Sequence, residues 1–258
     1  MDIRLTFDEN EINYDRYRPT YCPELFQAVI NSMPKGPKHA VEVGCGTGQA
    51  TAPFLAAGYT VDAVELGERL AAYAAKKFQD FPGFRVHNLP FEEFCASAES
   101  VDLLYSATAF HWIPEEIGYP KAFELLKPGG TIALFWNQPF VSRPEDPLHM
   151  EIQAIYERYF SHPKAQDKSQ QEVFRMRENT LLRHGFVNLE CRLFHRTRQF
   201  SAEDYIGLLL TYSDHRSMPE PEHTAFLDQI QNAIHARGGI LTVYDTMDLH
   251  IAQKPALL

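Results

Sequence analysis

Cysteine is scarce in this sequence, and its few cysteines are widely spaced. Cys22, Cys45, Cys95 and Cys191 form no CxxC pair and show no zinc-type spacing with histidine. A disulfide framework or a structural zinc site would require such patterns. We therefore expect reduced thiols, no metal site and a cytoplasmic protein.

Long apolar runs and an excess of basic charge are also missing. No hydrophobic stretch approaches the ~20 residues of a membrane span, and the N-terminal MDIRLTFDENEINYDRYRP has no apolar leader core. The formal net charge is -10, so phosphate backbones and anionic lipids would repel the chain. These features predict neither a nucleic-acid partner nor a membrane partner.

The sequence does contain enough apolar residues for a large core. Its 258 residues are 45% hydrophobic, which fits a single domain over residues 1–258. Between residues 39 and 136, helical patterns alternate with short apolar runs: HAVEVG, YTVDAVE, FRVHN, VDLLYSA and TIALFW. Such alternation predicts an α/β fold with a doubly wound, Rossmann-like parallel sheet.

The alternation stops after Asn137, where the pattern becomes mainly helical. We expect a helical insertion over residues 138–170, and then two strands with the sequences VNLECRLFHRT and TVYDTMDLHIAQK. The residues between these strands, 197–238, are too many for a hairpin turn and begin with a capping pattern at Ser201 and Asp204. This segment is predicted to form a helical lid.

Three alternating glycines follow the first apolar run, in EVGCGTG. Gly44, Gly46 and Gly48 fall where a strand meets a helix, at the sheet edge where open α/β folds bind ligands. A tight turn without a ligand would not require three glycines. A dinucleotide fingerprint, GxGxxG, would place glycine at position 49, but Gln49 stands there. The loop therefore favours a ligand without a pyrophosphate.

Two carboxylates accompany this loop. Glu65 ends the second apolar run and is placed to accept hydrogen bonds from two ribose hydroxyls. Glu42 precedes the loop and adds negative charge near a cationic ligand tail. An adenosine that carries a positively charged amino-acid tail satisfies both features. We therefore predict S-adenosyl-L-methionine as the cofactor, rather than NAD.

Four motifs in order resemble those of the class I S-adenosylmethionine-dependent methyltransferases. They are YDRYRPTYCPELF, VEVGCGTGQAT, NLPFEEF and SATAFHWI, within residues 14–136. The likeness is to the methyltransferase type 11 branch, which includes trans-aconitate methyltransferase-like enzymes of small molecules. It implies a mostly parallel sheet with an antiparallel final strand, a cofactor-binding core over residues 36–137 and an N-terminal cap over residues 1–30.

The resemblance also implies roles for individual residues. Arg18 would pair with the methionine carboxylate, Phe91 would lie at the adenine, and Ser106 would lie at the methyl-donor end. A solvated leader around Arg18 and a purely structural Phe91 are the alternatives. The complete set of cofactor-binding candidates is Tyr14, Arg18, Glu42, Gly44, Cys45, Gly46, Gly48, Glu65, Leu66, Phe91, Glu92 and Ser106.

His111, in the AFHWI stretch after the fourth apolar run of the core, is the catalytic candidate. An imidazole ordinarily titrates near pH ~6.5, which suits a general base or a group that positions the acceptor by hydrogen bonding. The alternative is that His111 ties the loop by bonding to backbone. Trp112 is expected to form pocket wall, because its indole can donate a hydrogen bond but cannot act as a base.

The predicted activity is methyl transfer to a small-molecule acceptor. A carboxylate acceptor would need no general base, whereas a hydroxyl or an amine would benefit from one. Carboxylic acid O-methylation is accordingly one form of the hypothesis. The alternatives are a non-catalytic protein that binds S-adenosylmethionine or S-adenosylhomocysteine, and an NAD(P)-dependent oxidoreductase, against which Gln49 argues.

Overall fold

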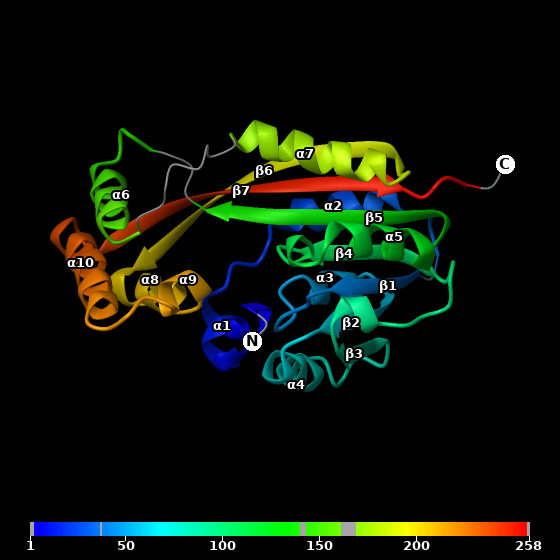
Figure 1. Ribbon diagram of the computed structural model, residues 1–258, viewed down its shortest axis with the longest axis horizontal. Coiled ribbons are helices and arrows are strands. Elements are labelled where there is room, and N and C mark those ends of the chain that lie inside the picture. Colours follow the sequence, from blue (N-terminus) through cyan, green and yellow to red (C-terminus); the bar gives the residue numbers. More distant parts are fainter. Residues whose placement is uncertain (1–2, 37, 140–142, 161–168, 257–258) are drawn as a thin grey trace.

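The computed structural model describes residues 3–36, 38–139, 143–160 and 169–256. Within these residues a seven-stranded sheet has the order β3-β2-β1-β4-β5-β7-β6 (Figure 1). The strands are β1 (Lys38–Val43), β2 (Tyr59–Glu65), β3 (Phe84–Asn88), β4 (Val101–Ala107), β5 (Leu126–Pro139), β6 (Val187–Ser201) and β7 (Ile240–Gln253).

The pairing within this sheet confirms the predicted fold class. Strands β1 to β5 pair in parallel, whereas β7 runs antiparallel to both β5 and β6. The chain leaves β1 toward β2 and β3 on one side, and continues with β4 on the other. A crevice therefore forms at the carboxyl ends of β1 and β4, the place where open α/β sheets bind ligands.

Both faces of the central strands are buried. Ala40 and Leu103 pack in one hydrophobic cluster, while their neighbours Val41 and Leu104 pack in another on the opposite face. The first face is covered by α2 (Pro23–Ser32), α3 (Thr51–Ala56) and α4 (Glu68–Lys77), and the second by α5 (Glu115–Leu125) and α7 (Gln170–Arg183). Two covered faces explain why these strands read as continuous apolar runs.

Strand β5 begins earlier than its sequence pattern predicts. The apolar run starts at Thr131, but Leu126 already pairs with Val101 of β4, and the register then shifts before Thr131 pairs with Leu103. Gly129 has a φ of 77°, a left-handed value that suits glycine at this irregularity. The KPGG sequence, residues 127–130, thus forms an irregular start of the strand.

A separate hydrophobic cluster lies at the far ends of β6 and β7 (Figure 1). The helices gathered there are α6 (Pro147–Tyr159), α8 (Ala202–Leu209), α9 (Ser213–Arg216) and α10 (Glu222–Ala236). Ser201 accepts the backbone N–H of Asp204 at 3.1 Å, so the predicted cap is present at the start of α8. Of the expected insertion over residues 138–170, positions 140–142 and 161–168 lie outside the described residues.

The N-terminal segment connects this helical cluster to the sheet domain. It consists of η1 (Ile3–Glu9) and α1 (Glu11–Tyr17). The carboxylate of Asp8 accepts the backbone N–H groups of Arg69 at 3.1 Å and Leu70 at 2.8 Å, which caps the start of α4. On its other side, the Tyr17 ring packs so closely on α8 that a Cβ added at Gly207 would lie 2.5 Å from it.

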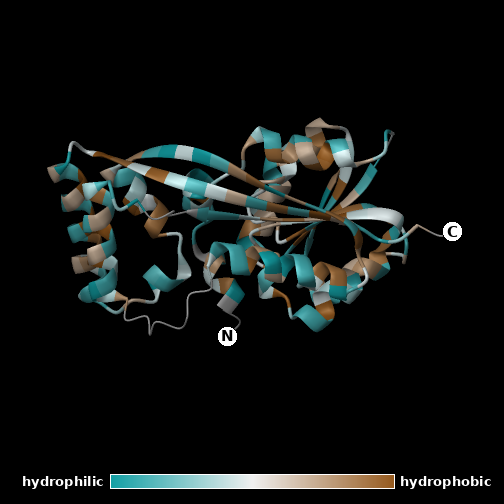
Figure 2. Ribbon diagram, turned by 90° about the horizontal axis from the view of Figure 1, so that it is seen from above, coloured by the Kyte–Doolittle hydropathy of each residue, from teal (hydrophilic) through white to brown (hydrophobic). Residues whose placement is uncertain are grey.

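Hydrophobic residues are concentrated along the central strands and on the helix faces turned toward them (Figure 2). None of the helices in the described ranges is both long and apolar enough to cross a membrane.

Candidate functional site

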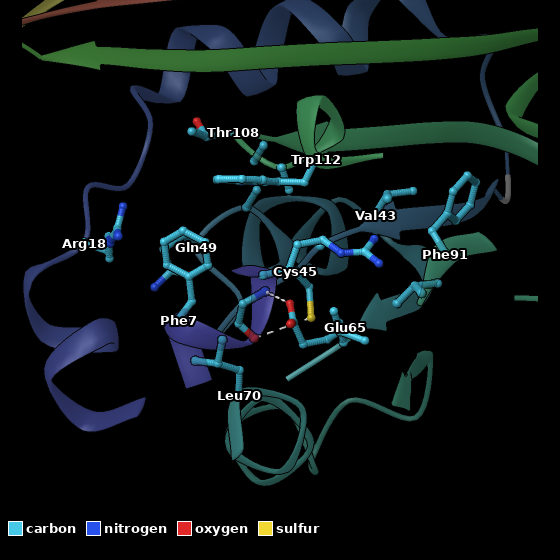
Figure 3. Close-up of a pocket in the computed structure, with 18 of the residues that line it drawn as sticks. Phe7, Arg18, Val43, Cys45, Gln49, Glu65, Leu70, Phe91, Thr108 and Trp112 are labelled. Atoms are coloured by element: carbon cyan, nitrogen blue, oxygen red, sulfur yellow. Dashed lines mark hydrogen bonds between the residues drawn. The ribbon is translucent and has the colours of Figure 1, made fainter. Parts of the chain in front are cut away.

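A cavity of about 330 Å³ lies at the carboxyl ends of β1, β2 and β4 (Figure 3). The N-terminal segment, the glycine loop, η3 (Phe110–Trp112) and residues 212–213 next to α9 form its walls. The candidate residues that line it are Tyr14, Arg18, Gly44, Cys45, Gly46, Glu65, Leu66, Phe91 and His111. Segments far apart in the sequence therefore meet around one cavity.

The three glycines of the loop serve different purposes. Their φ values are 70° at Gly44, 57° at Gly46 and 87° at Gly48, all in the left-handed region. A Cβ at Gly44 would lie 2.4 Å from the Cβ of Ala109, and one at Gly48 would lie 2.2 Å from the Phe78 ring. Gly44 and Gly46 line the cavity, whereas Gly48 is packed against the end of α4 and does not.

Glu65 fastens the glycine loop to the end of β2. Its Oε2 accepts the backbone N–H of Gly46 at 2.7 Å, and its Oε1 accepts that of Gly67 at 2.8 Å. Burial raises the pKa of this carboxyl group, and backbone donors at Gly67, Gly46 and Leu66 oppose the rise. A carboxylate can accept about four hydrogen bonds, so the group retains capacity for a ligand.

Arg18 lines the cavity inside a box of aromatic rings. Its guanidinium carbon lies 5.4 Å from the ring centre of Phe7, 5.0 Å from that of Tyr14 and 4.4 Å from that of Tyr212. One terminal nitrogen donates to the backbone oxygen of Thr211 at 2.6 Å, while Nε is buried without a hydrogen-bond partner. This fixed cation thus keeps an unused donor, of the kind that a carboxylate would satisfy.

Glu42 lies away from the cavity, in contrast to its expected place near a cationic tail. It is 1% exposed, and its Oε2 accepts the hydroxyl groups of Thr51 at 2.6 Å and Tyr105 at 2.8 Å. The reason is strand alternation, because Val41 and Val43 face one side of the sheet and Glu42 therefore faces the other. Burial raises its pKa to about 7, which weakens its charge at neutral pH.

Two further candidates also lie outside the cavity lining. Ser106 donates its hydroxyl to the backbone oxygen of Val43 at 2.7 Å and is 1% exposed. Glu92 accepts from Arg4 at 2.8 Å, and Arg4 itself lines the cavity. The side chains of Ser106 and Glu92 therefore do not line the cavity. Each would affect a ligand only indirectly, Ser106 by holding Val43 and Glu92 by holding Arg4.

Phe91 belongs to the hydrophobic core and also lines the cavity. It lines the cavity, yet only 3% of its surface is exposed, and its ring centre lies 6.4 Å from that of Phe94 and 6.3 Å from that of Phe110. The residue is therefore part of the core, with one part of its surface left for a ligand.

His111 lines the cavity and is held by a neighbour on β5. The indole Nε1 of Trp136 donates to its Nδ1 at 3.1 Å, rather than the imidazole bonding to backbone. The His111 side chain is exposed at the cavity. Desolvation by the protein packed around it, together with the positive charge of Arg177, lowers its pKa to about 4. The expected titration near pH ~6.5 therefore does not apply in this environment.

The structure also brings residues to the cavity that the sequence patterns did not indicate. Phe7 and Tyr212 complete the box around Arg18, and the hydroxyl groups of Tyr21 and Thr108 are 2.6 Å apart at the cavity wall. Thr108 has a φ of 55°, unusual for a β-branched residue, but no sequence motif marks this strain. These contacts join segments that are distant in the sequence, and the periodicity of apolar residues cannot predict such contacts.

Comparison with known proteins agrees with this geometry. Residues 40–130 match the family described as methyltransferase domain. An uncharacterised methyltransferase of Schizosaccharomyces pombe is 26% identical over 256 residues, covering 93% of this chain and 96% of that protein. The trans-aconitate 2-methyltransferase of Deinococcus radiodurans is 31% identical over 109 residues, covering 42% of this chain and 40% of that enzyme.

Solved structures share the fold at low sequence identity. A provisionally named type II methyltransferase from Anaeromyxobacter dehalogenans has a TM-score of 0.65 with 21% identity, covering 93% of this chain and all 100% of its own. Phosphoethanolamine N-methyltransferase 2 of Haemonchus contortus, in complex with S-adenosyl-L-methionine, has a TM-score of 0.57 with 12% identity, covering 99% of this chain and 60% of its own.

The matched family, these relatives and the shared fold all indicate a class I S-adenosylmethionine-dependent methyltransferase. The residues around the cavity fit such a cofactor. Gly46 has no side chain to obstruct a ligand and a left-handed φ, Glu65 retains free lone pairs, and the buried Nε of Arg18 has no partner. These are the groups that ribose hydroxyls and an amino-acid carboxylate require.

Proposed function

We propose that this methyltransferase binds S-adenosylmethionine in the cavity and methylates a small-molecule acceptor that carries a carboxylate. The observation that carries the choice of acceptor is the protonation state of the described side chains around the cavity. The tyrosine hydroxyl groups and the Cys45 thiol in the lining have raised pKa values and that of His111 is lowered, so each of these groups is poorly matched to take a proton from an acceptor at neutral pH.

Four side chains would hold the cofactor. Glu65 accepts hydrogen bonds from the ribose hydroxyls, Arg18 pairs with the methionine carboxylate, and Leu66 and Phe91 contact the adenine. Gly44, Cys45 and Gly46 let the backbone approach the ligand closely. When bound, S-adenosylmethionine supplies a sulfonium methyl group, whose carbon–sulfur bond breaks as an acceptor oxygen takes the methyl, leaving a thioether and a methyl ester.

The titratable tyrosine, cysteine and histidine side chains of the cavity are poorly suited to act as a base at the acceptor end. Burial raises the pKa of the hydroxyl groups of Tyr14, Tyr21 and Tyr212 and of the Cys45 thiol, so all four stay protonated at neutral pH. His111, with a pKa lowered to about 4, is a weak base. Its conjugate acid would lose its proton readily, so it is a poor match for a proton removed from an alcohol or an ammonium group.

A carboxylate avoids this requirement, because it is ionised at neutral pH and attacks without losing a proton. The relative from Deinococcus radiodurans supports this choice, since trans-aconitate is a polycarboxylate. The contribution of the chain is then to orient the two substrates and to exclude water, effects that supply about 7–11 kcal/mol in well-aligned systems. Phe7, Trp112 and the segment at Tyr212 form the wall that would exclude water.

The test is to incubate the purified protein with methyl-labelled S-adenosylmethionine and a panel of small carboxylic acids, phenols and amines. We expect label on a carboxylic acid, in a product that mild alkali hydrolyses because it is an ester. Label found only on phenols or amines would overturn the acceptor class. Failure to bind S-adenosylhomocysteine would overturn the cofactor site itself.

A further inference from the structure

We infer that His111 presents an N–H to the acceptor as a hydrogen-bond donor, and that Trp136, Arg177 and Asp248 are positioning residues that hold it in that state. The role toward the acceptor rests on the proposed function, whereas the state of the imidazole can be measured in the protein alone.

The four side chains form a line from the cavity wall into the protein. Trp136 of β5 donates to Nδ1 of His111 at 3.1 Å, and the guanidinium carbon of Arg177 of α7 lies 3.7 Å from the centre of the Trp136 ring. Arg177 in turn donates to Oδ2 of Asp248 on β7. Trp136 is 5% exposed and Asp248 is 1% exposed, so the inner part of the line is shielded from water.

The indole determines which nitrogen of His111 carries the proton. An indole N–H donates and never accepts, so the imidazole nitrogen that it meets must be unprotonated. A neutral imidazole carries one proton, which must then lie on the other nitrogen, Nε2. Protonation of both nitrogens would set two N–H groups against each other at 3.1 Å and would break the bond.

Arg177 and Asp248 explain why this arrangement is stable. The guanidinium lies over the face of the indole, a favourable cation–π contact that fixes the plane of Trp136. Asp248 is the buried counter-ion that keeps Arg177 there, and it is also 3.3 Å from Nε2 of His250. The positive charge of Arg177 opposes a second positive charge on His111, in agreement with the direction in which the pKa of His111 moves.

A donor at this position selects the acceptor. One oxygen of a carboxylate can accept the Nε2–H while the other oxygen takes the methyl group, so a single hydrogen bond orients the attacking atom. A protonated amine has no lone pair that could accept this hydrogen bond. The same N–H therefore favours an acceptor with two equivalent oxygens and disfavours amines.

The state of the imidazole is tested by nitrogen NMR on the uniformly labelled protein, with the His111 signals assigned from their loss in His111→Gln. We expect a neutral ring at neutral pH, with Nδ1 unprotonated and Nε2 protonated. In Trp136→Phe, which keeps an aromatic ring but removes the indole N–H, both tautomers should become populated. A proton on Nδ1 of the wild-type ring, or a doubly protonated ring, would overturn the inference.

The role of the donor is tested by the kinetics of two variants. His111→Gln keeps an N–H near the position of Nε2, so its kcat/KM for the acceptor should fall by less than about 3-fold. His111→Ala should raise the acceptor KM by about 10-fold or more, the loss of one charge-assisted hydrogen bond. A general base would instead make both variants lose kcat by about 100-fold or more, an outcome that contradicts the inference.

Arg183 lies on the same helix as Arg177 and provides a matched control for it. Arg177→Gln should raise the acceptor KM while leaving the affinity for S-adenosylhomocysteine unchanged, whereas Arg183→Gln, at the exposed end of α7, should change neither. If the two variants behave alike, Arg177 does not position His111. If NMR shows the Nε2–H ring but no carboxylate is methylated, the proposed function fails and the imidazole assignment stands.

Discussion

Gly46 donates its backbone N–H to Oε2 of Glu65 at 2.7 Å, although the two residues lie 19 positions apart in the chain. The bond joins the glycine loop after β1 to the end of β2. Glu65 therefore shapes the loop before any ligand arrives, and it also lines the cavity. A change at this residue should affect both the loop and the ligand.

Replacing Glu65 with Gln exchanges one acceptor oxygen for an amide group that cannot accept a backbone N–H. We expect the affinity for S-adenosylhomocysteine to fall by about 10- to 100-fold, which corresponds to about 1.5–3 kcal/mol. Isothermal titration calorimetry measures this change, with the exposed Glu68→Gln as control. Unchanged affinity in a folded Glu65→Gln protein would remove Glu65 from the ligand site.

Gly48 and Gly58 have similar backbone angles, so their alanine variants distinguish the cost of backbone strain from the cost of steric overlap. Gly48 and Gly58 have φ values of 87° and 83°, but a Cβ at Gly48 would lie 2.2 Å from the buried Phe78 ring, whereas Gly58 has nothing within 4 Å. Both alanine variants should lose about 1–2 kcal/mol to the left-handed backbone. Gly48→Ala should lose about 1–3 kcal/mol more through overpacking. Urea unfolding of both variants measures the difference, and equal losses would be incompatible with this packing.

The sequence predicted the elements whose signal is local. The central strands were recognisable because both of their faces are buried, and the glycine loop because its residues are adjacent in the chain. The place of Glu42 was mispredicted because its charge was considered without the alternation that turns it toward Tyr105. The bond between Trp136 and His111 could not be predicted, because 25 residues separate two side chains that meet only through the sheet.

The pair of His39 and Asp62 should make stability depend on pH. Their side chains are 2.7 Å apart, and this hydrogen bond raises the pKa of His39. Together with a second hydrogen bond at 2.8 Å to Nε2 of His87, it lowers the pKa of Asp62 to about 2. Because the folded pKa of His39 is raised, its contribution is complete below the unfolded value of ~6.5 and is lost as the pH rises through the folded value. Because that of Asp62 is lowered, its contribution is lost only as the pH falls from ~4 toward 2.

It follows that Asp62→Asn should reduce the free energy of unfolding more near pH ~5.5 than near pH ~9. Urea titrations at the two pH values measure this, with the exposed Asp80→Asn as control. A loss from Asp62→Asn that is the same at both pH values would show that the charged pair contributes nothing.

The contact between α1 and α8 should control the fit of Arg18. A Cβ at Gly207 would lie 2.5 Å from the Tyr17 ring, and the neighbouring Arg18 donates to Thr211 just beyond α8. We expect Gly207→Ala to separate the two helices and to weaken binding of S-adenosylhomocysteine several-fold. The same change made in Tyr17→Ala, where space is available, should have a smaller effect. Additive effects of the two substitutions in calorimetry would show that the contact does not position Arg18.

We propose that the cavity holds the amino-acid tail of the cofactor on Arg18 and its ribose on Glu65. This placement is tested by calorimetric titration of Arg18→Gln with S-adenosylhomocysteine and with 5′-methylthioadenosine, which lacks the amino-acid tail. We expect Arg18→Gln to weaken binding of S-adenosylhomocysteine by about 10-fold or more and to leave binding of 5′-methylthioadenosine unchanged, whereas Glu65→Gln should weaken binding of both. Equal loss of both ligands in Arg18→Gln, or loss of neither, would contradict the assignment.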